Sequence, residues 1–409
     1  MLKIVKPLVF EKPLGVRDYL PDQVRWKKEV ERRISESMEL WGYREIITPA
    51  LEYYDTVGDS SNIMQNRLYK LVDHNGKTLV LRPDMTTPIA RVVSSLLKEN
   101  PLPMRLCYNT SIYRMQEKDT GKNAEFFQSG VELIGSDQPY ADAEIIVLAV
   151  EALKAAGLRQ FKVAIGETAF LESLLHEKAS RYSDQLKKLL IKQDFAGWRE
   201  FVNGLPLAEQ DKACLLTLPK LQGSKEVISQ AETLTDDPKA IKALRYLQEI
   251  WDILEQHQVS QYVHIDFTTL RGQNYYTGMI FEIYAASIGY PICGGGRYDD
   301  LIAEFGRKAP AVGFGIWLER LIEALQVGIL TPEIYLFLFD QEDQTEVHDV
   351  IKRAKIWREK GNKVEILGCP ADQLERIAAE RKNDCQYLQI WTSEQWKKHV
   401  SCAEETGEV

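Results

Sequence analysis

The chain has 409 residues, of which 44% are hydrophobic and 27% are charged, and this composition excludes a disordered or fibrous protein. Its length exceeds that of one ordinary hydrophobic core, so two or three domains are expected. The formal net charge of -9 argues against tight binding of nucleic acid, which depends on Lys and Arg neutralising phosphates.

Cysteine use and hydropathy predict a cytoplasmic protein. No apolar run has the length of a secretory signal or of a membrane span. The six cysteines are too far apart for a CxxC pair or a Cys/His metal cluster, so reduced thiols and no metal ion are expected. They are Cys107, Cys214, Cys293, Cys369, Cys385 and Cys402.

The first part of the chain predicts a helix, a strand and then a strand that leads into a second helix. Apolar residues recur at helical spacing within residues 22–41, and a strand follows that Pro49 should end. The segment 78–91 predicts a strand and then a helix, since proline is tolerated in a first helical turn. Asp84 and Thr86 lie at that junction.

Residues 105–116 and 125–135 have the pattern of two strands joined by a polar connection, which predicts an antiparallel hairpin. Because side chains alternate between the faces of a strand, Gln128 and Glu132 share one face, and Arg114 lies on the neighbouring strand. Polar groups of two adjacent strands are therefore expected to lie side by side.

The rest of the chain predicts a helical insertion between two groups of strands. A helix is expected over 140–157, a strand over 161–166 and mostly helical structure over about 169–259. Further strands follow, then the glycine-rich run CGGGRYDD, expected to be a tight turn, and a strand that runs into a helix over 311–325. Residues 331–409 have the pattern of a small α/β domain.

Three arginines, Arg114, Arg271 and Arg320, fall in or beside predicted sheet elements, where an unpaired guanidinium group would be costly. Each should therefore meet an anion. For any single one, an internal ion pair is a more ordinary explanation than a bound ligand. The presence of all three beside glycine-rich segments favours the ligand.

Acceptors suited to an ammonium or imidazolium group are supplied by Asp84, Gln128 and Glu132. Tyr275 or Tyr276 would add a phenol and an aromatic wall, and strand alternation lets only one of them enter the pocket. The ordinary alternative is a buried hydrogen-bond network. No Ser, Cys or His constellation suits nucleophilic catalysis. The residues alone thus predict a polar pocket floored by glycine and arginine.

Seven short motifs, with matching order and spacing over most of residues 10–326, resemble the core of class II histidyl-tRNA synthetases. They are TPALE at 48–52, LRPDMT at 81–86, YRMQ at 113–116, FFQSGVELIG at 126–135, RGQNYYTG at 271–278, GGGRYDDL at 294–301 and GFGIWLERL at 313–321. The resemblance implies an α+β fold with a class II aminoacyl-tRNA synthetase-like antiparallel sheet flanked by helices, a dimer, and a histidine pocket. It also implies a catalytic-like domain over residues 1–326, with the helical insertion, and a truncated anticodon-binding-like α/β domain over 331–409.

The histidine-binding residues of that family carry over to matching positions of this sequence. They are Asp84, Thr86, Arg114, Gln128, Glu132, Arg271, Tyr275 and Tyr276. By this resemblance Asp84, where the family usually has Glu, and Thr86 hold the amino group. Glu132 suits the imidazole.

The residues that activate an amino acid in the synthetases are less complete here. Gln116 stands where the second class motif usually has Glu, Ala124 where it has a second arginine, and Asn274 where the family has Asp. Residues 331–409 carry 11 Lys and Arg against 16 Asp and Glu, a surface that should repel tRNA. We therefore expect neither efficient adenylation nor tRNA charging.

This combination, together with stretches such as FEKPLGVRDYLP and LRQFKVAIG, resembles the synthetase paralogues that join a short catalytic ATP phosphoribosyltransferase. The resemblance implies a non-catalytic regulatory subunit that activates the first step of histidine biosynthesis and conveys feedback inhibition by histidine. The implied partners are the short catalytic subunit, a second copy of this chain in a dimer within a mixed octamer, and L-histidine, with no tRNA, membrane or cofactor. An active histidyl-tRNA synthetase and a histidine-binding module with another partner stay open as alternatives.

Overall fold

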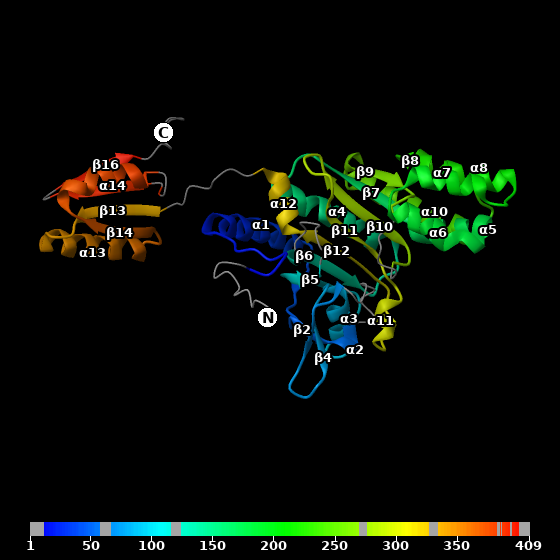
Figure 1. The fold of residues 1–409 in the computed structure, drawn as a ribbon, viewed down its shortest axis with the longest axis horizontal. Coiled ribbons are helices and arrows are strands. Elements are labelled where there is room, and N and C mark those ends of the chain that lie inside the picture. The colour runs from blue at the N-terminus through cyan, green and yellow to red at the C-terminus, as the bar shows by residue number, and fades with distance from the viewer. Residues whose placement is uncertain are drawn as a thin grey trace, which may run out of the picture. The chain divides into compact units, whose positions relative to one another are not determined.

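The computed structural model describes residues 12–57, 67–115, 124–269, 276–326, 334–382, 385, 387–392 and 395–400. The chain divides into two compact units, Met1–Val327 and Gly328–Val409, which are taken in turn (Figure 1). No helix in the described ranges combines the length and the apolar character needed to cross a membrane.

The large unit is built on a nine-stranded sheet in the order β1-β5-β6-β12-β11-β10-β7-β9-β8. Its strands are β1 (Arg44–Glu45), β5 (Met104–Tyr113), β6 (Glu125–Ile134), β7 (Phe161–Glu167), β8 (Gln222–Gly223), β9 (Val263–Asp266), β10 (Met279–Ala285), β11 (Pro291–Arg297) and β12 (Ala311–Trp317). The run from β5 to β7 is antiparallel, whereas β1 with β5 and β7 with β9 pair in parallel. The sheet is therefore mixed, and the predicted antiparallel hairpin, β5 and β6, lies next to the edge strand β1.

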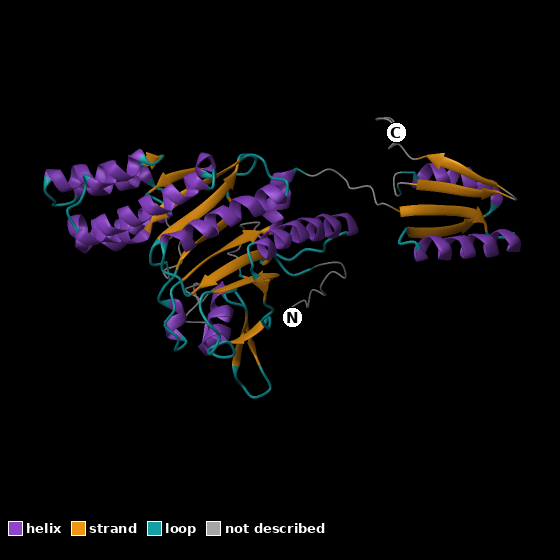
Figure 2. Cartoon of the chain, turned by 180° about the vertical axis from the view of Figure 1, so that it is seen from behind, coloured by secondary structure: helices purple, strands orange, loops and turns teal. Residues whose placement is uncertain are grey.

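Helices cover one face of this sheet (Figure 2). They are α1 (Pro21–Leu40), α4 (Pro139–Ala155), α10 (Pro238–Gln256) and α12 (Leu318–Leu325). Most of α4 is buried because it lies between the sheet and its neighbours α1 and α10, and this explains why its sequence is apolar nearly all round. Side chains of this layer such as Ile34, Val131 and Leu148 form the main core.

The opposite face carries three short helices and a small antiparallel sheet with the order β2-β4-β3. These elements are β2 (Leu51–Tyr53), α2 (Tyr54–Val57), β3 (Lys70–Val72), β4 (Thr78–Leu81), α3 (Thr86–Ser94) and α11 (Leu301–Glu304). Met85 and Ile89 of this layer pack with Leu106 of β5 in a second core. The junction of β4 and α3 is thereby held over the sheet.

Between β7 and β9 the chain forms a helical insertion. It contains α5 (Thr168–Ala179), α6 (Ser183–Ile191), α7 (Phe195–Gly204), α8 (Glu209–Thr217), α9 (Glu226–Glu232) and α10, together with the short strand β8. The last helix begins at Pro238, and the Asp237 side chain caps it by accepting the Lys239 N–H at 2.9 Å.

The small unit is a four-stranded sheet in the order β14-β13-β15-β16 with a helix against each face. Its elements are β13 (Ile334–Asp340), α13 (Gln344–Glu359), β14 (Lys363–Cys369), α14 (Leu374–Arg381), β15 (Tyr387–Thr392) and β16 (Gln395–Val400). Alternate side chains of β13 enter different cores, Phe337 beside α13 and Leu336 beside α14. The predicted small α/β fold is confirmed.

One prediction about local structure is wrong. The glycine-rich run expected to be a tight turn forms β11, in the interior of the large sheet. Its glycines are needed because neighbours approach the strand closely: a Cβ on Gly295 would lie 2.7 Å from the Phe314 Cβ, and one on Gly296 would lie 2.8 Å from the Tyr276 ring.

Candidate functional site

A pocket lies on the face of the large sheet opposite α4. It is lined by Asp84, Met85, Thr86, Tyr108, Arg114, Gln128, Glu132, Tyr276, Gly294, Tyr298, Gly313, Phe314, Gly315 and Trp317. Strands β6, β11 and β12 form its floor, and the β4–α3 junction contributes the three residues that begin at Asp84. Segments far apart in the sequence therefore meet in one polar cavity.

Glycine makes the floor of the pocket possible. Gly313 lies opposite Glu132 in the β12–β6 ladder, and a Cβ at residue 313 would overlap the Glu132 carboxylate. A Cβ on Gly315 would likewise overlap the side-chain nitrogen of Gln128. The two polar side chains of β6 therefore lie flat across neighbouring backbone that carries no side chain.

Glu132 is the most enclosed acid of the pocket, with 2% exposure. Its carboxylate accepts hydrogen bonds from the Tyr298 hydroxyl and, at 2.8 Å, from the Thr86 hydroxyl. Burial raises the pKa of Glu132 to about 8, because removal from water disfavours the charged form by more than these hydrogen bonds favour it. Near neutral pH the empty pocket therefore holds a largely protonated carboxyl group that a cationic ligand would ionise.

Asp84 supplies a second buried carboxylate with an unused acceptor. Its Oδ1 accepts the Thr87 N–H at 3.0 Å, while Oδ2 is buried and has no hydrogen-bond partner among the described residues. Burial raises the pKa of Asp84, and the nearby charge of Arg114 acts in the opposite direction. A buried acceptor without a donor is costly, so this oxygen is suited to a donor supplied by a ligand.

Two further contacts set the walls around these acids. Tyr108 lies opposite Gly130, and its hydroxyl donates to Gln128 Oε1 at 3.3 Å. Arg114 donates from Nε to the carbonyl oxygen of Pro83 at 2.8 Å, which holds the guanidinium group beside Asp84.

Six of the eight residues predicted from the sequence line this one pocket: Asp84, Thr86, Arg114, Gln128, Glu132 and Tyr276. The other two, Arg271 and Tyr275, lie outside the described residues. Arg320 does not line the pocket. It donates to the Pro291 carbonyl oxygen at 2.6 Å and stacks over the Trp317 ring at 4.6 Å.

Sequence reasoning missed Tyr108, Tyr298 and Trp317. The signal for Tyr108 was present, since strand pairing at β5 and β6 places it opposite Gly130, between the two polar residues of β6. Tyr298 follows the glycine-rich strand, and the expectation of a turn hid the alternation that sends it toward Glu132.

This arrangement can bind but offers little for covalent chemistry. Two buried carboxylic acids, an amide and three phenols surround a floor of bare backbone, which suits a small cationic or zwitterionic ligand. Across the described part of the chain, no group of three His, Cys, Asp or Glu side chains could hold a metal ion.

Relatives in sequence support a common origin for the whole chain. The model of the histidyl-tRNA synthetase family matches residues 15–321. The chain is 44% identical over 358 residues to the ATP phosphoribosyltransferase regulatory subunit of Bacillus subtilis strain 168, which covers 87% of this chain and 91% of that protein. It is 43% identical over 354 residues to the regulatory subunit of Halalkalibacterium halodurans, covering 86% and 89%.

Solved structures agree with this relationship. The crystal structure of an ATP phosphoribosyltransferase regulatory subunit/histidyl-tRNA synthetase from Bacillus halodurans C matches with a TM-score of 0.85 at 40% identity, covering 95% of this chain and 100% of that chain. Histidyl-tRNA synthetase from Nostoc sp. PCC 7120 matches with a TM-score of 0.80 at 19% identity, covering 96% and 97%, which shows a shared fold. The chain therefore belongs to the histidyl-tRNA synthetase family, within the branch of ATP phosphoribosyltransferase regulatory subunits.

Proposed function

We propose that this chain is a non-catalytic regulatory subunit that binds L-histidine, activates a short catalytic ATP phosphoribosyltransferase and conveys feedback inhibition by histidine to it. The observation that carries the proposal is a pocket with two buried carboxylic acids, Asp84 and Glu132, in a chain 44% identical to a regulatory subunit. The signal must be a difference in histidine affinity between two states of the complex. The proposed setting is the first step of histidine biosynthesis, in the cytoplasm.

The polar groups of the pocket match those of histidine. Asp84 would accept the ammonium group, because its buried Oδ2 has no partner among the described residues, and Thr86 lies beside it. Glu132 would accept the imidazole N–H, because its carboxylate lies across the glycine floor of the pocket. Arg114, whose charge acts on the Asp84 carboxyl group, would meet the ligand carboxylate. Gln128, Arg271, Tyr275 and Tyr276 complete the proposed contact set.

Ala124 argues against the alternative of an active synthetase. This residue, where the family resemblance places an arginine, is 2% exposed, and a Cβ on Gly15 would lie 2.7 Å from its side chain. Its N–H donates to the Gly15 carbonyl oxygen at 2.6 Å, so the position is closed by packing.

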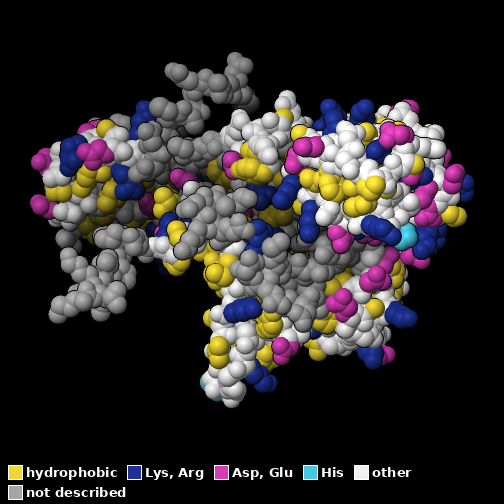
Figure 3. Space-filling view, turned by 45° about the vertical axis from the view of Figure 1, so that its right-hand side comes forward, with side chains coloured by type: hydrophobic (Ala, Val, Ile, Leu, Met, Phe, Trp, Pro, Cys, Tyr) yellow, Lys and Arg dark blue, Asp and Glu magenta, His cyan; other side chains and the backbone are white. Residues whose placement is uncertain are grey.

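The surface supports the absence of tRNA binding. On the face shown in Figure 3, Lys and Arg side chains are interspersed with Asp and Glu. The proposed anticodon-binding-like domain, residues 331–409, has more acidic than basic residues. Pyrophosphate exchange and tRNA charging test this directly: both should stay at background, whereas robust histidine-dependent activity in both assays would establish the synthetase instead.

Titration calorimetry with L-histidine tests the ligand. The wild-type chain or its complex should bind histidine, and Glu132→Gln should weaken binding by about tenfold or more, as expected for loss of a charged hydrogen-bond partner. Glu346→Gln is the matched control: Glu346 is also buried, at 6% exposure, but it belongs to the small unit and does not line the pocket. Equal effects of the two variants would refute the assignment of Glu132.

A mixing experiment tests the partner. We propose that this chain is a dimer and that it joins the short transferase in a mixed octamer. Mixing the two proteins should therefore give one larger species. Obligate interfaces of this kind bury more than ~2,000 Å². Transferase activity should rise and become sensitive to histidine. Failure to co-elute at micromolar concentration would favour a histidine-binding module with another partner. Co-elution without a change in transferase rate would mean that the chain acts only as a scaffold.

A further inference from the structure

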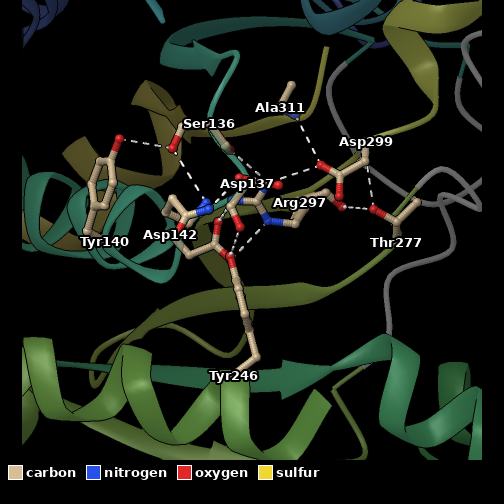
Figure 4. Close-up of polar contacts among 10 residues, drawn as sticks. Ser136, Asp137, Tyr140, Asp142, Tyr246, Thr277, Arg297, Asp299 and Ala311 are labelled. Atoms are coloured by element: carbon tan, nitrogen blue, oxygen red, sulfur yellow. Dashed lines mark hydrogen bonds and ion pairs between the residues drawn. The ribbon is translucent and has the colours of Figure 1, made fainter. Parts of the chain in front are cut away.

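A buried ion pair lies behind the floor of the pocket (Figure 4). Arg297, the last residue of β11, is 4% exposed and meets Asp142 of α4, which is completely buried. Its Nε donates to Asp142 Oδ2 at 3.1 Å and its Nη2 donates to Oδ1 of the same side chain, a bidentate pair. The Nη1 group donates to Asp299 Oδ1 at 3.0 Å and to the Ser136 carbonyl oxygen at 3.1 Å.

The same arginine belongs to, or contacts, two of the three segments that carry tyrosines of the pocket. Tyr298, the next residue, points to the other face of the sheet and donates to Glu132. The main-chain carbonyl oxygen of Arg297 accepts the Thr277 N–H at 2.8 Å, and Thr277 follows Tyr276 directly. The Asp299 N–H then donates to the Thr277 hydroxyl at 3.1 Å. The segment with Tyr276 and the segment with Tyr298 are therefore hydrogen-bonded to each other beside the pocket.

We infer that Arg297 is a positioning residue for the ligand pocket, fixing Tyr298 and Tyr276 from behind the sheet through Asp142, Asp299 and Thr277. The inference rests on the proposed function only for the identity of the ligand. Arg297 does not line the pocket, so it acts through its neighbours. The bidentate fork is needed because a lysine ammonium offers a single point of charge and cannot hold Asp142, Asp299 and the Ser136 carbonyl in the same geometry.

The helical insertion joins the same network. Tyr246 of α10 lies 6.0 Å from the Arg297 guanidinium group, measured to the ring centroid, and its hydroxyl donates to the Asp137 carbonyl oxygen at 3.2 Å. Figure 4 shows this tyrosine reaching toward Asp142 and Arg297 from the helix below them. The position of the arginine is thus determined by α4, α10 and the sheet together.

A double-mutant cycle in histidine affinity tests the inference. Arg297→Lys should weaken histidine binding by about tenfold, and so should Tyr298→Phe, because each loosens the contact with Glu132. If Arg297 acts through Tyr298, the loss in the double variant will be smaller than the product of the two single losses. Independent, multiplicative losses would overturn the inference.

Arg105→Lys provides a matched control. Arg105 forms a bidentate pair with Glu144, also on α4, at 2.8 and 2.6 Å, and does not line the pocket. This variant should keep wild-type histidine affinity, and an equal loss there would overturn the inference. If Arg297→Lys does not fold, Asp299→Asn replaces it, because Asp299 is 37% exposed and its loss leaves the Asp142 pair intact.

Amide hydrogen exchange provides a readout that needs no ligand. In the ligand-free protein, Arg297→Lys should speed exchange of the Thr277, Asp299 and Ala311 N–H groups, whose acceptors all belong to this network. Arg105→Lys should leave them unchanged. Unchanged exchange in Arg297→Lys would overturn the positioning role. Absence of histidine binding by the wild type would refute only the proposed ligand.

Discussion

Gly313 of β12 lies directly opposite Glu132 of β6, so close that any side chain at residue 313 would meet the Glu132 carboxylate. Gly313→Ala should therefore push Glu132 off the floor, destabilise the protein by about 1–3 kcal/mol and weaken histidine binding. Gly289→Ala is the control, because nothing lies within 4 Å of a Cβ at that residue. Calorimetry on both variants checks the prediction, and wild-type affinity in Gly313→Ala would contradict it.

Stability should depend on pH through Glu132. Its folded pKa of about 8 lies above the ordinary value of 4.5, so between these pH values the folded state binds the extra proton and stability falls as pH rises. Glu132→Gln removes this pH-dependent loss. As pH rises across that range, the free energy of unfolding of the variant should therefore increase relative to that of the wild type, by up to about 1.4 kcal/mol per pH unit. Denaturant unfolding of ligand-free protein at pH 5 and pH 8 measures it. If the difference in unfolding free energy between variant and wild type is the same at pH 5 and pH 8, the raised pKa of Glu132 is disproved.

Asp84 should discriminate between ligands with and without an ammonium group. Asp84→Asn keeps the Oδ1 acceptor for the Thr87 N–H but removes the charge, and it should weaken histidine binding by about tenfold or more. Imidazolepropionate lacks the ammonium group, so its affinity should not fall. Competition calorimetry compares the two ligands, and an equal loss for both would show that Asp84 does not contact the ammonium group.

Restoring the missing arginine should not restore a synthetase. Ala124→Arg places a long charged side chain at a site that is 2% exposed and packed against Gly15, and overpacking of this kind costs about 1–3 kcal/mol. Thermal unfolding should show the loss, and pyrophosphate exchange should stay at background. Normal stability together with new exchange activity would mean that the site opens more readily than its packing indicates.

Strand alternation made one part of the pocket, the polar face of the β5–β6 hairpin, predictable from the sequence. The β5–β6 hairpin and the shared face of Gln128 and Glu132 follow from side-chain period alone, and both are confirmed. The junction that carries Asp84 and Thr86 was also located correctly. Its grouping with Gln128 and Glu132 rested on their shared acceptor chemistry and on the family resemblance, because distant segments meet through packing that no local pattern records.

The Arg297 network was beyond sequence reasoning for a different reason. Its partners come from α4, α10 and the segment after β11, which lie far apart in the chain, and a glycine-rich run preceding an arginine looked like a turn. Phe314 and Tyr276 occupy the space that side chains at Gly295 and Gly296 would need, which explains why an interior strand carries consecutive glycines.

Gly130, Gly315 and Gly294 stand opposite one another on three adjacent strands, a row of bare peptide across the pocket. Few substitutions along that row could change the pocket's preference to another amino acid. Enlarging Gly130 would collide with Tyr108, and enlarging Gly315 would collide with Gln128. New ligand preferences would therefore arise by exchanging the acids and phenols that line the pocket, because the positions of Gly130 and Gly315 have no room for a side chain.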